Sequence, residues 1–255
     1  MNDFFGVLTV FLFTSLAPVV ASEVGFVLGR RRKSDVDPDG RSRISMVEGA
    51  LPGLLGLLLG FTSGSSVGRF DLRQDLVVKE ANALGTVVLR GDFLQPPVQS
   101  EDRAKLREHA ELRLEFVQAG LDAEKPVAES GKPGRLQSKL RERARDEARK
   151  RPTPIAASLV AALNDLFDPG ETRLAALNNT VPAGVRLVLY FVAALTVGSL
   201  GYGSDLTGRR LVLSVSFVSA LMAVILTLLV DLGYPRHGLI RLSQESMIRV
   251  RESLK

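Results

Sequence analysis

Residues 46–68 read MVEGALPGLLGLLLGFTSGSSVG, and this stretch decides the fold class of the chain. In water so much glycine would oppose a helix, because each residue costs up to about 1 kcal/mol relative to alanine. In lipid the backbone must satisfy its own hydrogen bonds, so the stretch is predicted to form a membrane-spanning helix. Its glycines recur every three or four residues, at Gly49, Gly53, Gly56, Gly60, Gly64 and Gly68.

The regular spacing of these glycines predicts a close contact with another helix. Small residues about one turn apart let a second backbone approach, which is a common device of membrane packing. A pore-facing or hinge role for the same stripe is the alternative. The helix-packing role is assigned to five of the glycines, namely Gly49, Gly56, Gly60, Gly64 and Gly68.

Three further apolar blocks lie at residues 4–29, 183–203 and 211–230. Each is long enough to cross a bilayer core, which takes roughly 20 residues. The first block is followed rather than preceded by basic residues, so it is predicted to be an uncleaved helix and not a signal peptide. A short polar turn joins the last two blocks. The chain is therefore predicted to be an all-α, polytopic membrane protein with four transmembrane helices in two hairpins and a helical extramembrane middle segment.

Charge divides the chain into regions that match this interpretation. The middle segment holds 19 Lys and Arg against 18 Asp and Glu and has no apolar run long enough to span, so it is predicted to be solvated. The predicted regions are transmembrane helices one and two at 1–68, the charged helical segment at 69–183, transmembrane helices three and four at 184–231, and a basic C-terminal tail at 232–255.

Composition argues against several classes of function. The net charge is +5, but the basic residues flank the apolar blocks instead of forming a basic face with interleaved aromatics, which argues against nucleic acid as a partner. Cysteine is absent, so thiolate metal sites and a cysteine nucleophile are excluded. The sequence has no Walker A loop, HExxH or GxSxG motif. We expect neither an enzyme nor a metal or cofactor site.

Two acidic residues stand in apolar surroundings and are candidates for buried acids. Glu80 falls between Leu76 and Ala83 on the apolar stripe of a helix that continues the second span. Such an acid must find a partner or raise its pKa, so an ion pair and a role in ion or proton binding both stay open. Glu23 lies inside the first block, where an acid suggests function, although its place near the helix end also allows a position at the level of the lipid headgroups.

The flanking charges give conflicting predictions of orientation. Six Lys and Arg in residues 30–43 and two in 204–210 favour a cytoplasmic position for these turns, which would place the middle segment outside. The basic tail and Arg69, Arg73 and Lys79, which follow the second span, argue for the opposite arrangement. By the short flanks alone, the first arrangement is favoured by a small margin.

Several stretches resemble a bacterial membrane family described as having a bestrophin-like domain. They cover both pairs of apolar blocks and their junctions. The resemblance implies a multi-pass protein of the bacterial inner membrane. The matching stretches are LPGLLGLLLGF at 51–61, Arg69-Phe70, EANALGT at 80–86, LNDLF at 163–167, TRL at 172–174, and Asp231, Pro235 and GLI at 238–240.

A more distant resemblance links the second span to the bestrophins, pentameric anion channels with a cytosolic helical domain. It rests on Leu-Gly-Phe followed by an Arg-aromatic pair, here Arg69-Phe70. The resemblance implies that Gly53, Leu57 and Phe61 line the pore and that the middle segment is cytosolic. Gly53 departs from the bulky apolar residue of that family, and Asp71 stands where a second Trp is usual.

Two functional hypotheses follow from these observations. The first is an oligomeric anion channel whose pore is lined by the second helix. Its expected partners are the lipid bilayer, further copies of the chain, and chloride or another small anion. The alternative is a non-conducting membrane interaction or scaffold module, in which the glycine stripes only pack.

Overall fold

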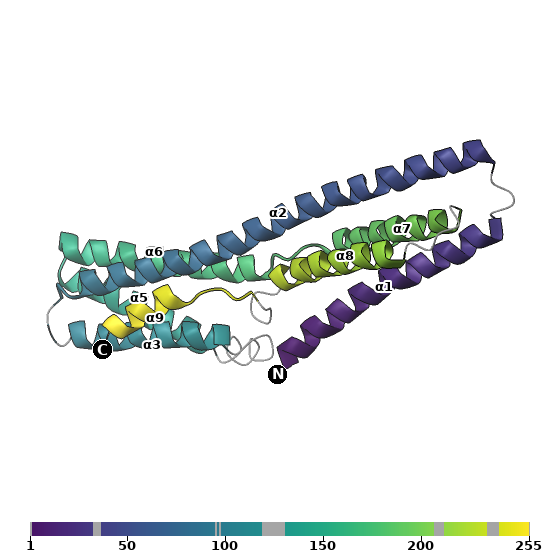
Figure 1. Cartoon of the computed structure of the whole chain (residues 1–255). Helices are drawn as coiled ribbons and strands as arrows, with labels where there is room; N and C mark the ends of the chain where they lie inside the picture. The colour runs from purple at the N-terminus through teal and green to yellow at the C-terminus, as the bar shows by residue number, and fades with distance from the viewer. Residues whose placement is uncertain are drawn as a thin grey trace. The chain divides into compact units, whose positions relative to one another are not determined.

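The computed structural model describes residues 2–32, 37–94, 96, 98–118, 131–206, 212–233 and 240–254. Over these ranges the fold is all-α, as predicted, and Figure 1 shows the helices in chain order. The helices are α1 (Asn2–Arg32), α2 (Pro38–Gly91), α3 (Val98–Gln118), α5 (Lys132–Lys150), α6 (Pro154–Asn178), α7 (Ala183–Leu206), α8 (Val212–Gly233) and α9 (Glu245–Ser253).

The chain forms two compact units. The apolar unit comprises residues 1–68, 180–234 and 238–240, and the charged unit comprises residues 69–179, 235–237 and 241–255. Helix α2 contributes residues to both units. Most of the tail, predicted to be a separate region, is therefore part of the charged unit.

Three helices among the described residues are long and apolar enough to cross a membrane, namely α2, residues Ala183–Ser204 of α7 and residues Val215–Gly233 of α8. The predicted first span in α1 falls partly on residues whose side chains lie outside the described set. The turn predicted to close the second hairpin, at residues 207–211, also lies outside it. The arrangement of four spans in two hairpins therefore stays a prediction.

A glycine seam joins α1 to α7 in the apolar unit, where Figure 1 shows the two helices side by side. A Cβ atom added to Gly29 would lie 2.5 Å from the carbonyl oxygen of Tyr202, and one added to Gly198 would lie 3.3 Å from that of Ala21. Added Cβ atoms on Gly25 and Gly201 would clash with backbone carbonyls of the facing helix. The close backbone approach expected in lipid thus occurs between α1 and α7.

One core holds the helices of the charged unit together. The apolar stripe of α5 is buried at Leu136, Leu140 and Ala144, and it packs with buried residues of α2, α3, α6 and α9. Each fully buried leucine contributes about 1.5–3 kcal/mol relative to an exposed one. Arg143 of α5 also bonds Asp102 of α3 through Nε at 2.7 Å. Burial on one face and ion pairs at its rim therefore fix α5 on α3.

Helix α6 has a defined start and a charged residue at its end. The Thr153 hydroxyl accepts a hydrogen bond from the Ala156 backbone N–H at 3.2 Å, and Pro154 fits the first helical position. At the other end Arg73 of α2 donates to the carbonyl oxygens of Ala176 and Asn179, at 3.0 and 2.7 Å. A cation there complements the negative end of the helix dipole. Burial lowers the pKa of Arg73, and the nearby charge of Arg69 lowers it further.

Candidate functional site

One face of the apolar part of α2 is covered by α7 and α8. Leu55 and Leu59, one turn apart, are buried there. Thr62 continues the same side, and its hydroxyl donates to the Leu58 carbonyl at 2.8 Å. The residues that form this cluster with Leu55 and Leu59 are Leu189, Ala193, Leu226 and Leu229.

The opposite face of α2 carries the three predicted pore residues. Leu57 follows Leu55 by two residues, which turns it about 200° around the helix axis. The side chains of Leu57 and Phe61 are 57% and 72% exposed, and a Cβ added to Gly53 would meet nothing within 4 Å. We call Gly53, Leu57 and Phe61 the open face of α2. No other described part of the chain covers it, so it is available to a pore, to lipid or to another chain.

The five glycines assigned to helix packing have no neighbour inside the described chain. A Cβ added to Gly49, Gly56, Gly60, Gly64 or Gly68 would meet nothing within 4 Å. The seam that the structure does contain lies between α1 and α7. A packing role for the α2 glycines therefore needs a partner from outside the described residues and stays a prediction.

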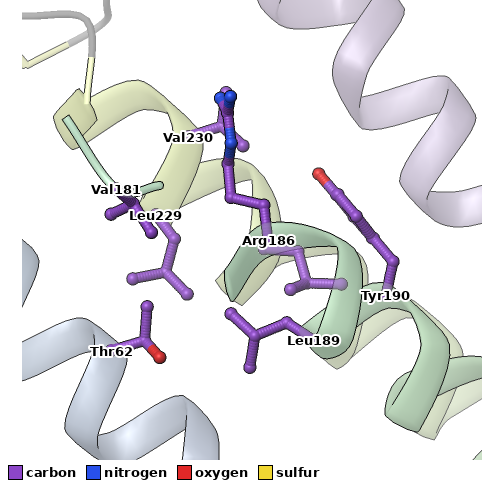
Figure 2. A pocket seen from close by; sticks show the side chains of 8 residues that line it. Thr62, Val181, Arg186, Leu189, Tyr190, Leu229 and Val230 are labelled. Atoms are coloured by element: carbon purple, nitrogen blue, oxygen red, sulfur yellow. The ribbon is translucent and has the colours of Figure 1, made fainter. Parts of the chain in front are cut away.

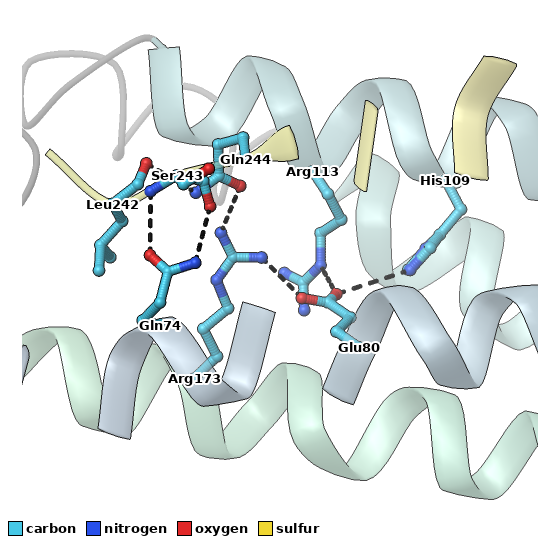
Figure 3. Close-up of polar contacts among 8 residues, drawn as sticks. All are labelled: Gln74, Glu80, His109, Arg113, Arg173, Leu242, Ser243 and Gln244. Atoms are coloured by element: carbon cyan, nitrogen blue, oxygen red, sulfur yellow. Dashed lines mark hydrogen bonds and ion pairs between the residues drawn. The ribbon is translucent and has the colours of Figure 1, made fainter. Parts of the chain in front are cut away.

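Glu80 is the centre of a buried charge cluster in the charged unit (Figure 3). Its side chain has no exposed surface and makes ion pairs with Arg113 of α3 and Arg173 of α6. The Arg173 Nη1 atom donates to Glu80 Oε2 at 2.7 Å, and Arg113 Nε donates to Oε1. His109 Nε2 lies 3.9 Å from the same Oε1. The acid therefore links α2, α3 and α6 through three basic side chains.

The charges in this cluster set its protonation state. Burial alone would raise the pKa of Glu80, but the charges of Arg113 and Arg173, a hydrogen bond from Arg173 and the interaction with His109 lower it below its ordinary value. Burial lowers the pKa of His109 to about 4, the charge of Arg113 adds to this, and Glu80 opposes it. Near neutral pH the cluster thus contains one carboxylate, two guanidinium groups and a neutral imidazole.

His109 packs against an aromatic ring at the edge of the cluster. Its ring meets the ring of Phe167 edge to face, with centroids 5.9 Å apart, and Arg141 lies over the same ring at 4.7 Å. Among the described residues, Nε2 of His109 has no hydrogen-bond partner. The imidazole is therefore held by packing more than by hydrogen bonds.

The segment before α9 is tied to the same cluster. Arg173 Nη2 donates to Gln244 Oε1 at 3.1 Å. The amide of Gln74 donates to the Ser243 carbonyl at 3.2 Å and accepts from the Ser243 backbone N–H at 3.0 Å. Met247 is then fully buried in the core. These contacts explain why most of the predicted basic tail is part of the charged unit.

Glu23 is exposed on α1 in the described chain. The reason is the side from which α1 is packed: Ser22, Gly25 and Gly29 face α7, which leaves Glu23 outside the seam. Its burial would need cover from outside the described chain and stays a prediction. Glu80, the other candidate, lies in the centre of its unit.

Among the described residues no group of three or more His, Asp or Glu side chains is placed to hold a metal ion. The acids of the cluster around Glu80 are outnumbered by bases, so its chemistry favours structural ion pairing over cation binding. The sequence indicated Glu80 through its apolar neighbours Leu76 and Ala83. It gave no signal for Arg113, His109 or Arg173, because these lie on other helices.

Comparisons with known sequences and with solved structures agree with each other. The sequence matches the model of the Bestrophin-like domain family over residues 15–247. No curated protein sequence matches the chain. Among solved structures, a single-substitution variant of a bacterial bestrophin homologue from Klebsiella pneumoniae matches with a TM-score of 0.72 at 15% identity, covering 97% of this chain and 96% of that one.

Two further structures of the Klebsiella pneumoniae homologue give similar values. Another single-substitution variant has a TM-score of 0.66 at 16% identity and covers 96% of this chain and 97% of its own. The form phased on zinc also has a TM-score of 0.66 at 16% identity, with 95% and 96% covered. At this identity the likeness establishes a shared fold over nearly the whole length of both chains.

Proposed function

Because this chain belongs to the Bestrophin-like family of membrane proteins, we propose that it assembles into a ring of identical subunits that conducts small anions. In this assembly the open face of α2, with Gly53, Leu57 and Phe61, lines the pore. The supporting observation is that the face carries bulky apolar side chains that no other part of the described chain covers. Helices α7 and α8 pack on the opposite side of α2.

Leu57 and Phe61 are suited to a hydrophobic constriction. They are four residues apart, so their side chains lie on nearly the same face of the helix. In a ring of subunits each position forms an apolar collar around the axis. A narrow apolar collar expels water and raises the barrier to an ion, which is one way in which channels gate.

Gly53 makes the proposed pore wider at one end of the constriction. It lies one turn before Leu57 and has no side chain, so the same ring is wider there. The pore then narrows from Gly53 through Leu57 to Phe61. Gly64 and Gly68 lie on this same face, seven residues after Leu57 and Phe61, so the apolar collar ends at Phe61.

For the topology, we propose a multi-pass protein of the bacterial inner membrane with the charged unit in the cytosol. The support is the family membership together with Arg69, Arg73 and Lys79 just beyond the apolar part of α2. This is opposite to the orientation that the short flanks favour. Because most of the tail belongs to the charged unit, its basic residues count toward the same side.

The test is halide efflux from liposomes that contain equal amounts of protein. Replacing Leu57 and Phe61 together by Ala should widen the constriction and raise chloride efflux about ten-fold or more over the parent. The matched control is Leu187→Ala with Phe191→Ala, which removes the same two residue types at the same spacing from an exposed face of α7. The control should leave efflux within about two-fold of the parent.

Two results would contradict the proposal. If neither the parent nor the α2 variant passes ions while both remain assembled, the membrane scaffold module becomes the better description. If both double variants raise efflux equally, the change reflects a loosened bilayer contact and not a pore on α2.

A further inference from the structure

A hollow in the apolar unit lies between α2, α7, α8 and the segment that precedes α7 (Figure 2). Its empty volume is about 270 Å³, including the part open to the outside. Most of its lining is aliphatic, with Val181 beside Leu229 and Leu189 across from them. Thr62 of α2 faces them, but its hydroxyl is already bonded to the Leu58 carbonyl. The floor of the hollow therefore suits hydrocarbon.

Two polar side chains line the same hollow. Arg186 and Tyr190 are four residues apart on α7, so they lie one above the other on the same face, as Figure 2 shows. Both make interactions within the protein. The guanidinium has five N–H donors in a planar fork, so it can keep a protein contact and still bind a phosphate, and a phenol can donate one more hydrogen bond.

The position of the hollow along the helices matches the edge of a bilayer. The apolar stretch of α7 begins at Ala183, so Arg186 lies in its first turn. Val230, which also lines the hollow, is close to the end of the apolar stretch of α8 at Gly233. Arginine and tyrosine at this level are typical of the lipid headgroup region, with acyl chains beginning just below. The positive end of the α7 dipole adds to the attraction for an anion.

We propose that this hollow binds a membrane phospholipid. Arg186 holds the phosphodiester, the Tyr190 hydroxyl donates to it, and the first part of an acyl chain lies over the mouth of the hollow that Leu189 and Leu229 line. Asp231, which follows the lining residue Val230, is buried, and its Oδ2 accepts a hydrogen bond from the Ile240 backbone N–H at 3.0 Å. One of its oxygens is thus engaged within the protein. The combination of an apolar floor with a cationic rim selects a phospholipid over a free anion.

The test is native mass spectrometry of the full-length protein in detergent, titrated with phosphatidylglycerol. Arg186→Gln should weaken the first lipid-binding step about ten-fold, and Tyr190→Phe about three-fold, because the second variant loses one neutral hydrogen bond. Arg43→Gln is the matched control, since it removes one exposed arginine from the other end of the apolar part of α2. It should bind lipid as the parent does. Inorganic phosphate should neither bind at comparable concentrations nor displace the lipid.

Four outcomes would overturn the proposal. Equal losses in Arg186→Gln and Arg43→Gln would show only general attraction of lipid to basic protein. Phosphate that competes at the same concentration as the lipid would show a free-anion site. Unchanged lipid binding in both hollow variants would exclude the hollow itself. Oligomers that dissociate in Tyr190→Phe, with lipid affinity unchanged, would show that a second copy of the chain covers this face.

Discussion

Removing the charge of Glu80 should destabilise the charged unit more than any other single carboxylate change. The substitution Glu80→Gln keeps the size of the side chain but leaves Arg113 and Arg173 without their counter-charge. The two guanidinium side chains are only 10% and 5% exposed, so water can replace little of the lost interaction. Breaking a buried ion pair from one side costs about 3–5 kcal/mol.

This cost translates into a measurable shift of the melting temperature. For a chain of this size each kcal/mol corresponds to about 2–4 °C, so the expected fall is about 6–20 °C. The assay is thermal unfolding of the detergent-solubilised protein, followed by circular dichroism at neutral pH. Asp75→Asn is the control, because Asp75 pairs with Lys79 at 2.7 Å on the surface, with both side chains more than half exposed. Such pairs contribute at most about 1 kcal/mol.

The result that would refute this reasoning is a Glu80→Gln melting temperature within about 2 °C of the Asp75→Asn value. The cluster would then contribute no more than a surface pair. A second variant separates charge from packing: Glu80→Gln combined with Arg113→Met should recover part of the lost stability, because it removes one of the two uncompensated charges. Further loss in that double variant would also contradict the account.

Three more predictions follow from the same structure. The stability of the folded protein should fall as the pH drops from about 6.5 toward about 4. The folded pKa of His109 lies below its ordinary value, so the unfolded chain binds the proton more readily in this range. Melting temperatures measured at several pH values should depend less on pH in His109→Phe than in the parent. Gly25→Leu should prevent α1 from packing on α7, so no folded protein should be recovered in detergent. Gly60→Leu should leave each chain folded and change only the oligomeric state, as measured by size-exclusion chromatography. A misfolded Gly60→Leu would contradict this. With the charged unit in the cytosol, an impermeant maleimide should label Asp39→Cys in intact cells and Lys139→Cys only after permeabilisation. The reverse pattern would show the opposite topology. The chain has no native cysteine that would also react.

Local periodicity made much of the fold predictable. The stripe of Leu136, Leu140 and Ala144 is set by sequence neighbours, and those residues are buried on one face of α5. The continuation of α2 beyond its apolar part was predicted from Leu76 and Ala83, which share one face of an amphipathic helix. Such features depend on residues a few positions apart, where helix geometry fixes which side chains share a face.

The glycine seam shows where this reasoning fails. The six glycines at positions 49–68 of α2 are conspicuous in the sequence, yet an added Cβ on any of them would meet nothing within 4 Å in the described chain. The seam uses Gly25 and Gly29 of α1 with Gly198 and Gly201 of α7, about 170 residues away in the chain. Spacing shows that a helix permits close approach, but it does not show which helix approaches.

The partners of Glu80 in the charge cluster could not be predicted from the sequence, for a related reason. The position of Glu80 among apolar residues indicates burial, because an amphipathic helix turns that face inward. Its partner Arg113 lies on α3 among several other basic residues, and Arg173 is the one basic residue in the sequence of α6. Only the packing of α2, α3 and α6 brings these two arginines to Glu80.

The most direct test of the pore on α2 is chemical modification of a single cysteine at Leu57. Chloride efflux from liposomes is measured for Leu57→Cys before and after reaction with a bulky cationic methanethiosulfonate, with Leu187→Cys on α7 as the control. The account predicts that complete modification at position 57 changes efflux by about ten-fold or more, and that modification at 187 leaves it unchanged. Complete modification of Leu57→Cys, verified by mass spectrometry, with efflux equal to that of the unmodified protein would contradict it.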